Sequence, residues 1–233
     1  MDFGTALMDF GTAHVADAIV RLGLPKRHAP FGMRAVLRDQ KLVIGRAAPV
    51  RHYGSVDAFL EAIGRAEKGD VLVADNGGRS DESCIGDLTA VEARFAGLAG
   101  IVIFGAHRDA RELREIGLPI WSLGVHPFGP TEIRPPPAAP DEAVQLGSAL
   151  VMRNDWIAAD EDGVVICAGE YRDQVLAEAA RLAKTETAQR RGLAQGTPLR
   201  QQLRFAEFLE ARRRDPGLSF RTHLARGGGA IET

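Results

Sequence analysis

The chain has 233 residues, 45% of them hydrophobic and 26% charged, which is ordinary for a globular protein and enough for one large domain with its own core. The formal net charge of −2 provides no basic footprint for nucleic acid or an anionic membrane, so neither is expected as a partner. No apolar run approaches the roughly 18 residues of a membrane helix and no hydrophobic leader follows a basic N-terminus, which favours a cytoplasmic protein.

The N-terminal third of the chain predicts two helices. The letters MDFGTAL at 1–7 are followed by MDFGTAH at 8–14, which indicates a duplicated or alternative start more than a functional repeat. From Thr12, a candidate cap, apolar residues at helical spacing predict a helix that stops at Gly23. Ser55 is a candidate cap for a second helix, which would end at Gly69.

The middle of the chain alternates strands and helices. Continuous runs of β-formers predict buried strands at 71–74 and 101–104, and the segment 119–122 is expected to be a third. Apolar residues from Leu88 to Ala99 predict the helix between the first two strands, and 110–116 the next helix. Such crossovers make a parallel sheet, whose strand ends meet at one edge, so Asp87, Arg108 and Asp109 are expected to converge.

The last third predicts a hairpin and a helical tail. The prolines at 135–137 and 140 predict an extended connection. Asp162-Gly163 is a hairpin signal between strands at 156–160 and 164–166. Helices are expected at about 170–191 and 199–214, and helical tails of this length commonly wrap a neighbouring subunit. The arginines at 212–214 are expected to be a solvated helix end.

The converging residues favour metal-assisted chemistry on a 2-oxo acid. An Asp that follows a buried strand, here Asp109, is able to bind Mg²⁺ or Mn²⁺, and Asp87 could hold and orient a water on the metal. Arg108 offers a planar fork for a carboxylate or enolate oxygen. The N–H groups of Leu88 and Thr89, which follow Gly86, would form an anion site. Taken singly, Asp87 and Asp109 are equally well explained as helix caps, and only their combination favours chemistry.

The lysines and cysteines narrow the type of site. A Schiff-base aldolase needs a lysine in an apolar site. The four lysines stand in polar or turn-like segments, which favours a metal-dependent mechanism: Lys26, Lys41, Lys68 and Lys184. Cys84 and Cys167 lack further ligands at metal spacing, so neither a zinc site nor a disulfide framework is expected. His107, beside Arg108, is interpreted as a loop histidine without a special role in preference to a pocket residue.

The segment from Gly69-Asp70-Val71 through Gly86-Asp87 and Arg108-Asp109 to Pro119 resembles the RraA-like family. That family includes the 4-hydroxy-4-methyl-2-oxoglutarate and 4-carboxy-4-hydroxy-2-oxoadipate aldolases, whose signature is an Asp, twenty intervening residues and Arg-Asp. Twenty residues also separate Asp87 from Arg108. The family further contains non-catalytic regulators of ribonuclease E, which lack the Asp that stands here at 87.

The resemblance implies a fold, an assembly and a reaction. The fold would be a single-domain α/β/β/α layered α/β fold of the swivelling phosphohistidine type over 1–233, with a core at about 12–170 and a helical extension at 170–233. It would form a homotrimer or homohexamer, in which a neighbour's carboxylate such as Glu186 could complete the site. The substrate would be a 4-hydroxy-2-oxo acid that the sequence does not specify, cleaved to pyruvate, with oxaloacetate decarboxylation as a second activity.

The same resemblance assigns roles to individual residues. Asp109 would be the metal ligand for Mg²⁺ or Mn²⁺, Arg108 would bind substrate, and Asp87 would hold a metal-bound water. The segment Gly86, Asp87, Leu88 and Thr89 would bind the pyruvyl carboxylate. The alternative function is a non-catalytic regulator that binds ribonuclease E or another protein.

Overall fold

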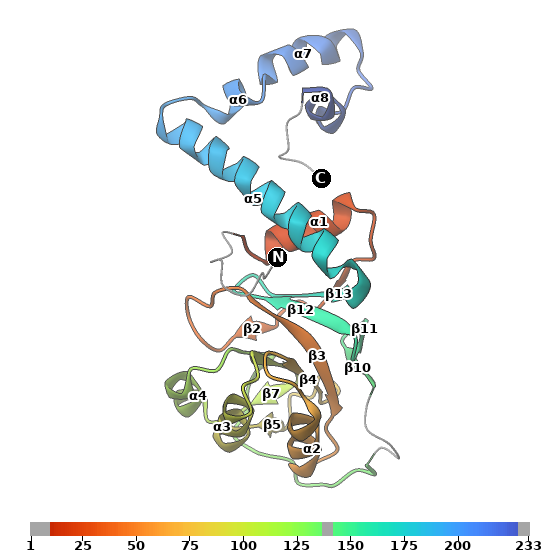
Figure 1. Cartoon of the computed structure of the whole chain (residues 1–233), viewed down its shortest axis with the longest axis vertical. Coiled ribbons are helices and arrows are strands. Elements are labelled where there is room, and N and C mark those ends of the chain that lie inside the picture. The colour runs from red at the N-terminus through yellow and green to blue at the C-terminus, as the bar shows by residue number, and fades with distance from the viewer. Residues whose placement is uncertain (1–9, 137–141, 228–233) are drawn as a thin grey trace. The chain divides into compact units, whose positions relative to one another are not determined.

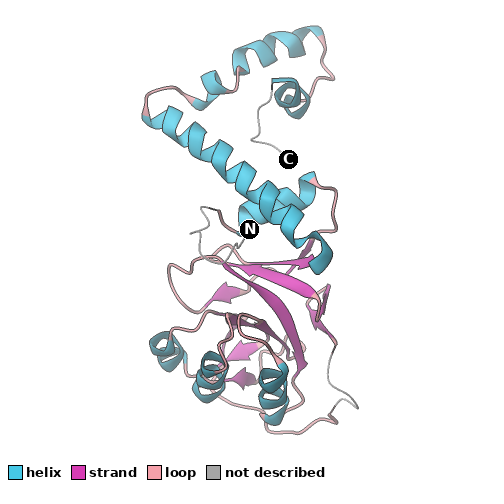
Figure 2. Cartoon of the chain, viewed as in Figure 1, coloured by secondary structure: helices cyan, strands magenta, loops and turns pink. Residues whose placement is uncertain are grey.

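The computed structural model describes residues 10–136 and 142–227, which fall into two compact units. The larger unit comprises Gly11–Ala13 and Lys26–Asp173, and the smaller one contains His14–Pro25 and the chain from Gln174 onward. The predicted α/β class is confirmed for the larger unit (Figures 1 and 2). That residues 1–233 form a single domain stays a prediction.

An eight-stranded sheet forms the centre of the larger unit. In the order β1-β13-β12-β3-β4-β6-β8-β2, the strands β3, β4, β6 and β8 run parallel, as predicted. The outer pairs are antiparallel, including the predicted hairpin β12-β13. The bounds are β1 Arg27–His28, β2 Arg34–Ala35, β3 Val43–Arg51, β4 Val71–Asp75, β6 Gly100–Phe104, β8 Ile120–Ser122, β12 Asp155–Ala159 and β13 Val164–Ala168.

Side chains of the central strands alternate between two apolar cores. Leu72 and Ile101 face the core that the helices cover, whereas Val71 and Val102 face a second core, which includes the fully buried Trp121. The first core is covered by α2 Asp57–Arg65, α3 Asp87–Phe95 and α4 Ala110–Ile116, which lie side by side (Figure 1). The second includes residues of the hairpin β10 Ala143–Leu146 and β11 Ala149–Met152. Burial on both faces explains why these strands are continuously apolar.

A second, three-stranded parallel sheet begins where the strands of the first one end. It consists of β5 Ser83–Ile85, β7 Ala106–His107 and β9 Gly124–Val125. Gly105 separates β6 from β7 with φ 157°, a backbone angle at the edge of what L side chains adopt. A Cβ at Gly105 would stand 2.9 Å from Cβ of Asn76, so this close approach needs glycine. The strand pair β5-β7 carries Gly86 and Arg108 at its carboxyl ends.

Helix α3 packs on the sheet with its small residues, not with its large ones. Its buried residues are Thr89, Ala90 and Ala93. The predicted apolar stripe points outward, with Leu88, Val91 and Phe95 exposed by 79%, 49% and 89%. The helix also ends at Phe95, earlier than the predicted Ala99, with Gly97 in the left-handed region at φ 81°. Small side chains let the helix backbone approach the sheet closely, and the large apolar face is left for another surface.

The smaller unit is helical. It contains most of α1 Thr12–Arg21, together with α5 Arg172–Ala194, α6 Leu199–Gln202, α7 Phe205–Arg214 and α8 Phe220–Gly227, and a short 3-10 turn, Gly169–Tyr171, precedes α5. The predicted helix at 199–214 is broken at Arg204, whose φ of 51° is left-handed. Phe208 is buried by the rings of Phe205 and Phe220. Within the described ranges, no helix is both long and apolar enough to cross a membrane.

Two predicted helix caps are not formed in the expected way. Thr12 is the first residue of α1 and not the residue before it. Its hydroxyl donates a hydrogen bond of 2.6 Å to the distant carboxylate of Asp160. Ser55 lies outside α2, whose N-cap is Val56 without a side-chain cap bond. Of the proline cluster, the residues at 137 and 140 lie outside the described ranges, and Pro135 and Pro136 belong to no helix or strand, as predicted.

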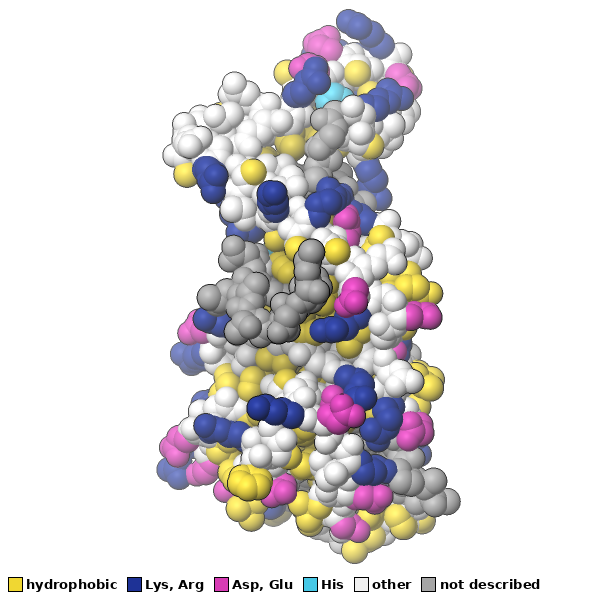
Figure 3. Space-filling model, viewed as in Figure 1, with side chains coloured by type: hydrophobic (Ala, Val, Ile, Leu, Met, Phe, Trp, Pro, Cys, Tyr) yellow, Lys and Arg dark blue, Asp and Glu magenta, His cyan; other side chains and the backbone are white. Residues whose placement is uncertain are grey.

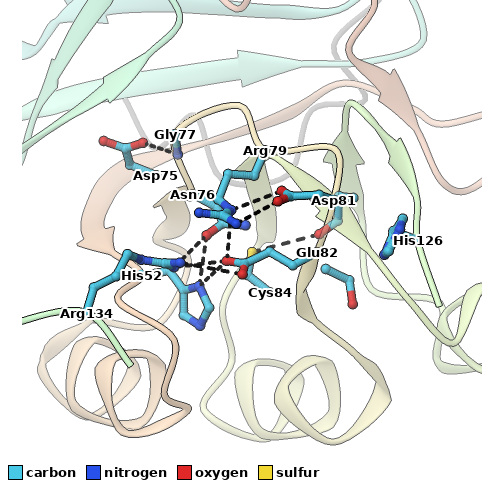
Figure 4. A network of polar contacts seen from close by, with 12 residues as sticks. His52, Asp75, Asn76, Gly77, Arg79, Asp81, Glu82, Cys84, His126 and Arg134 are labelled. Carbon is cyan, nitrogen blue, oxygen red and sulfur yellow. Dashed lines mark hydrogen bonds and ion pairs between the residues drawn. The ribbon is translucent and has the colours of Figure 1, made fainter. Parts of the chain in front are cut away.

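A network of polar side chains fixes the loop that leads from β4 to β5 (Figure 4). The buried carboxylate of Glu82 accepts a hydrogen bond from Arg134 at 2.9 Å and lies 3.4 Å from Nε of Arg79. A hydrogen bond of 2.9 Å joins Nδ1 of His52 to Oδ1 of Asn76, and Arg134 also donates to this oxygen at 3.4 Å. These bonds tie the ends of β3 and β4 to the residue that precedes β5, which sets where β5 begins.

The network predicts that stability falls in mild acid. Burial lowers the pKa of His52 below its ordinary value of 6.5; Arg134 lowers it further, and the bond to Asn76 and the charge of Glu82 oppose the shift. Because the unfolded chain then binds more protons than the folded one, the free energy of unfolding should decrease as the pH falls below 6.5. Urea unfolding at about pH 7.5 and about pH 5.5 measures this difference. His52→Gln should reduce it, and an unchanged pH dependence in this variant would contradict the assignment.

Candidate functional site

The structure brings Asp87, Arg108 and Asp109 together, as the sequence predicts. Strand β5 ends at Ile85, and β7, its parallel neighbour, ends at His107. The N–H of Arg108 donates to the carbonyl of Ile85 at 3.0 Å, which places the two loops side by side. Oδ2 of Asp109 then accepts the N–H of Asp87 at 3.2 Å and lies 3.5 Å from Nε of Arg108. The three charged residues meet at the first residue of α3.

The Asp109 carboxylate does not cap its own helix, so that alternative is wrong for this residue. Asp109 is the N-cap of α4 by position, but its side chain makes no cap hydrogen bond there. Its backbone is left-handed at φ 57° and ψ 40°, which costs an ordinary L residue about 1–2 kcal/mol and is tolerated best by Asp and Asn. Such an uncommon backbone turns the carboxylate toward α3, away from α4.

The N-terminus of α3 is occupied by carboxylates of the chain itself. Gly86 is the N-cap, and Asp87 is the first helical residue. Oδ1 of Asp87 accepts the N–H of Leu88 at 2.7 Å, beside the bond from the Asp87 N–H to Asp109. Asp87 thus binds one of the donors predicted for a substrate carboxylate. The use of Gly86, Leu88 and Thr89 by a substrate stays a prediction.

Two glycines line the side chain of Arg108. A Cβ at Gly86 would stand 2.3 Å from Oδ2 of Asp109 and 3.2 Å from Nε of Arg108, so no other residue fits there without moving the site. A Cβ at Gly129 would stand 2.9 Å from Nη1 of Arg108. The side chain of Arg108 is half exposed, so its guanidinium is open to a ligand from solvent.

The donor set around Asp109 suits a cation that keeps most of its waters. Its side chain is 34% exposed, and its carboxylate is turned toward the start of α3 by Oδ2. Over residues 10–136 and 142–227, no group of three or more His, Cys, Asp or Glu is placed to hold a metal ion. A single, partly exposed carboxylate is a ligand of the kind that Mg²⁺ or Mn²⁺ accepts while keeping its waters. The binding of either ion by Asp109 stays a prediction.

Sequence reasoning did not single out Gly129, which contacts Arg108, or Ser83, which binds the residue before Gly129. Ser83 is buried at the start of β5, and both its N–H and its hydroxyl donate to the carbonyl of Phe128, at 2.8 and 3.0 Å. This bond places Gly129, the next residue, against Arg108. Ser83 and Phe128 are 45 positions apart in the sequence, so no local pattern predicts their contact.

His107 is a buried strand residue and not the loop histidine that was predicted. It is 4% exposed on β7, and its Nδ1 is 2.7 Å from Oγ of Ser122. Burial lowers its pKa. Both cysteines, Cys84 and Cys167, are free, and burial raises the pKa of each thiol.

Glu186 has partners within its own chain. Its carboxylate lies 3.3 Å from Nε2 of His14 and 3.0 Å from Nη2 of Arg190. All three residues belong to the smaller unit. The participation of Glu186 in a neighbouring subunit's site stays a prediction.

Two provisionally named aldolases are similar to this chain. A protein of Albidiferax ferrireducens is 40% identical over 120 residues, which are 49% of this chain and 68% of the relative. A protein of Laribacter hongkongensis is 32% identical over 160 residues, 68% of this chain and 96% of the relative. Both are provisionally named 4-hydroxy-4-methyl-2-oxoglutarate aldolase.

Solved structures share the fold. RraAS2 of Streptomyces coelicolor, described as an unusual member of the RNase ES inhibitor RraA protein family, is 29% identical with a TM-score of 0.68, over 79% of this chain and 93% of that one. An uncharacterized protein of Pseudomonas syringae pv. tomato has a TM-score of 0.73 at 22% identity, over 82% and 92%. The family model described as RraA-like, Aldolase/RraA, matches residues 12–166, about two thirds of the sequence. From this match and the shared architecture, the chain belongs to the RraA-like family.

Proposed function

We propose that the protein is a divalent-metal-dependent aldolase that cleaves a 4-hydroxy-2-oxo acid of the 4-hydroxy-4-methyl-2-oxoglutarate type to pyruvate and a second oxo acid. The observation that carries the proposal is the meeting of Asp87, Arg108 and Asp109 at one glycine-lined helix start. The names of the two bacterial relatives support it. The absence of a lysine from this group of residues favours metal chemistry over a Schiff base.

Asp109 would hold the Mg²⁺ or Mn²⁺ ion, which when bound supplies a Lewis acid for the C1 carboxylate and C2 keto oxygen of the substrate. Arg108 presents its planar fork to the same end of the substrate and stabilises negative charge on the C2 oxygen. The Leu88 N–H becomes available to the substrate carboxylate when Asp87 leaves it. Gly86 and Thr89 would complete this part of the substrate-binding site.

Asp87 is the proposed proton acceptor. Through a water that it orients, its carboxylate takes the proton of the C4 hydroxyl, so that C4 becomes a carbonyl. The C3–C4 bond breaks, and its electron pair moves to form the enolate of pyruvate, which Arg108 stabilises. A proton then returns to C3. Decarboxylation of oxaloacetate breaks the corresponding bond, releases CO₂ and passes through the same enolate, so it is proposed as a second activity.

A regulator that binds ribonuclease E or another protein is the second candidate function. It is favoured by the likeness to RraAS2, which is described as belonging to an RNase ES inhibitor family. Such a binder has no evident need for a carboxylate at Asp87. This residue therefore separates the two candidates.

The exposed stripe of α3 supports the proposal that the protein is a homotrimer or homohexamer. Leu88, Val91 and Phe95 form a large apolar face, and Leu60 on the neighbouring α2 is 49% exposed. A second copy of the chain would remove this face from water. The face begins at Leu88, directly after the candidate site residue Asp87. A cytoplasmic location stays a prediction.

The metal role of Asp109 is tested with Asp109→Asn, because Asn tolerates the left-handed backbone that this position requires. For the wild-type protein, we expect cleavage to disappear after treatment with a chelator and to return when Mg²⁺ or Mn²⁺ is added. The variant should bind Mn²⁺ at least about tenfold more weakly, since it lacks the carboxylate charge. Calorimetric titration with Mn²⁺ measures this without activity. Equal Mn²⁺ affinity in the variant would remove Asp109 as the ligand.

The role of Asp87 is tested with Asp87→Asn. The metal should remain bound, because Asp87 acts through water, whereas kcat for 4-hydroxy-4-methyl-2-oxoglutarate should fall on the order of 10²–10⁴-fold. Pyruvate release over a panel of 4-hydroxy-2-oxo acids and oxaloacetate gives the rates. A wild-type rate in this variant would show that Asp87 has only a structural role at the start of α3, and it would favour the regulator.

The assembly is tested with Phe95→Asp, which places a charge on the exposed stripe. We expect light scattering to show three or six copies of the 25.1 kDa chain for the wild-type protein, and a smaller particle for the variant. Ile133→Asp changes an exposed apolar residue outside α3 and serves as the control. A wild-type particle of one chain would exclude the proposed assembly.

A further inference from the structure

We propose that Gly129 and Ser83 are positioning residues that set where the Arg108 guanidinium stands. This inference rests on the proposed function for its catalytic consequence, but the placement of the side chain is a claim of its own. It concerns how one arginine is held in place while its donors stay free.

Arg108 is held by contacts along its whole length. Its N–H is bound to the Ile85 carbonyl at 3.0 Å. Its Cγ and Nε lie against the Cα of Gly86, where an added Cβ would be 3.3 and 3.2 Å from them. Its Nη1 lies against the Cα of Gly129, where an added Cβ would be 2.9 Å away. The side chain therefore runs between two backbone positions without side chains.

Both of these backbone positions are tied to strand β5. Gly86 directly follows β5, and Ser83 is its first residue. Ser83, which is 2% exposed, donates two hydrogen bonds to the Phe128 carbonyl. The polar network around Glu82 fixes the residue before Ser83 in turn (Figure 4). Strand β5 thus fixes the positions of both glycines, Gly86 and Gly129, that flank Arg108.

The guanidinium itself is left with free donors. Among the described residues, its side-chain partner is Asp109, at the long distance of 3.5 Å from Nε. The side chain is half exposed. A guanidinium that is placed by backbone walls, and not by hydrogen bonds, keeps its N–H fork for a carboxylate or an enolate oxygen.

Gly129→Ala is a selective probe of this arrangement. The φ of Gly129 is not in the left-handed region, so alanine meets no backbone strain there. The atom that its Cβ would meet is the far end of a flexible side chain, so Arg108 should move while the fold stays intact. Gly64→Ala is the matched control, because Gly64 in α2 has no atom within 4 Å of an added Cβ.

The placement is measured by the ¹⁵Nε–¹Hε resonance of Arg108, identified by its loss in Arg108→Lys. We expect Gly129→Ala to shift this resonance, Ser83→Ala to shift it less because the Ser83 N–H bond remains, and Gly64→Ala to leave it unchanged. The melting temperature of Gly129→Ala should stay close to that of the wild-type protein, whereas Gly64→Ala should melt no lower than the wild type, because alanine is preferred to glycine in a helix. An unshifted resonance in Gly129→Ala overturns the inference, whatever the activity of the protein.

The catalytic consequence is measured by a double-mutant cycle on pyruvate release. Gly129→Ala alone should lower kcat/KM on the order of 10²-fold, the effect of misplacing a catalytic group by about 1 Å. In the Arg108→Lys background it should change kcat/KM less than about threefold. A lysine ends where Cζ of Arg108 stands, and Cζ is 3.8 Å from the added Cβ, an ordinary contact.

The outcomes separate this inference from the proposed function. A wild-type protein that cleaves no 2-oxo acid removes the proposed function, and the resonance alone then decides the placement. A protein that cleaves substrate, but loses as much from Gly129→Ala in the Arg108→Lys background as in the wild type, contradicts a role through Arg108.

Discussion

The arrangement of the candidate site depends on one hydrogen bond, from the N–H of Asp87 to the carboxylate of Asp109. It joins the first residue of α3 to the N-cap residue of α4, and two unusual features of the backbone accompany it. Gly86 must lack a side chain, because a Cβ would lie 2.3 Å from the carboxylate oxygen. Asp109 has a left-handed backbone, and its side chain makes no cap hydrogen bond to its own helix. The side chain of Arg108 contacts both Gly86 and Asp109, so its position depends on these two residues.

The parallel sheet and the convergence of the charged residues could be predicted because local patterns carry them. The segments at 71–74 and 101–104 are apolar without interruption, and burial of β4 and β6 from both sides explains this. The parallel order then brings the following loops to one edge. The helix at 110–116 could be predicted with its exact bounds, because Asp109 and Gly117 mark its two ends in the sequence.

The face of α3 could not be predicted, because both of its faces carry apolar residues. The large residues Leu88, Val91 and Phe95 form the stronger periodic pattern, yet Ala90 and Ala93 are the ones that contact the core. Periodicity identifies a stripe, but the space available above the sheet decides which stripe is buried. The strands β5, β7 and β9 are two or three residues long and exist only through pairing with distant partners, so no local signal marks them. The contact of Gly129 with Arg108 depends on this pairing as well.

The backbone of Asp109 restricts which residues can occupy this position during evolution. A left-handed residue outside glycine is tolerated best as Asp or Asn, so large or β-branched side chains would be removed by their cost to folding, before any effect on chemistry. Among the tolerated residues, only Asp brings a negative charge to the start of α3. If Asp109 binds a metal as proposed, a descendant that lost this role could keep the same turn with Asn or Gly, and its backbone would be unchanged. The residue type at this single turn would then distinguish catalytic from non-catalytic branches that share one backbone.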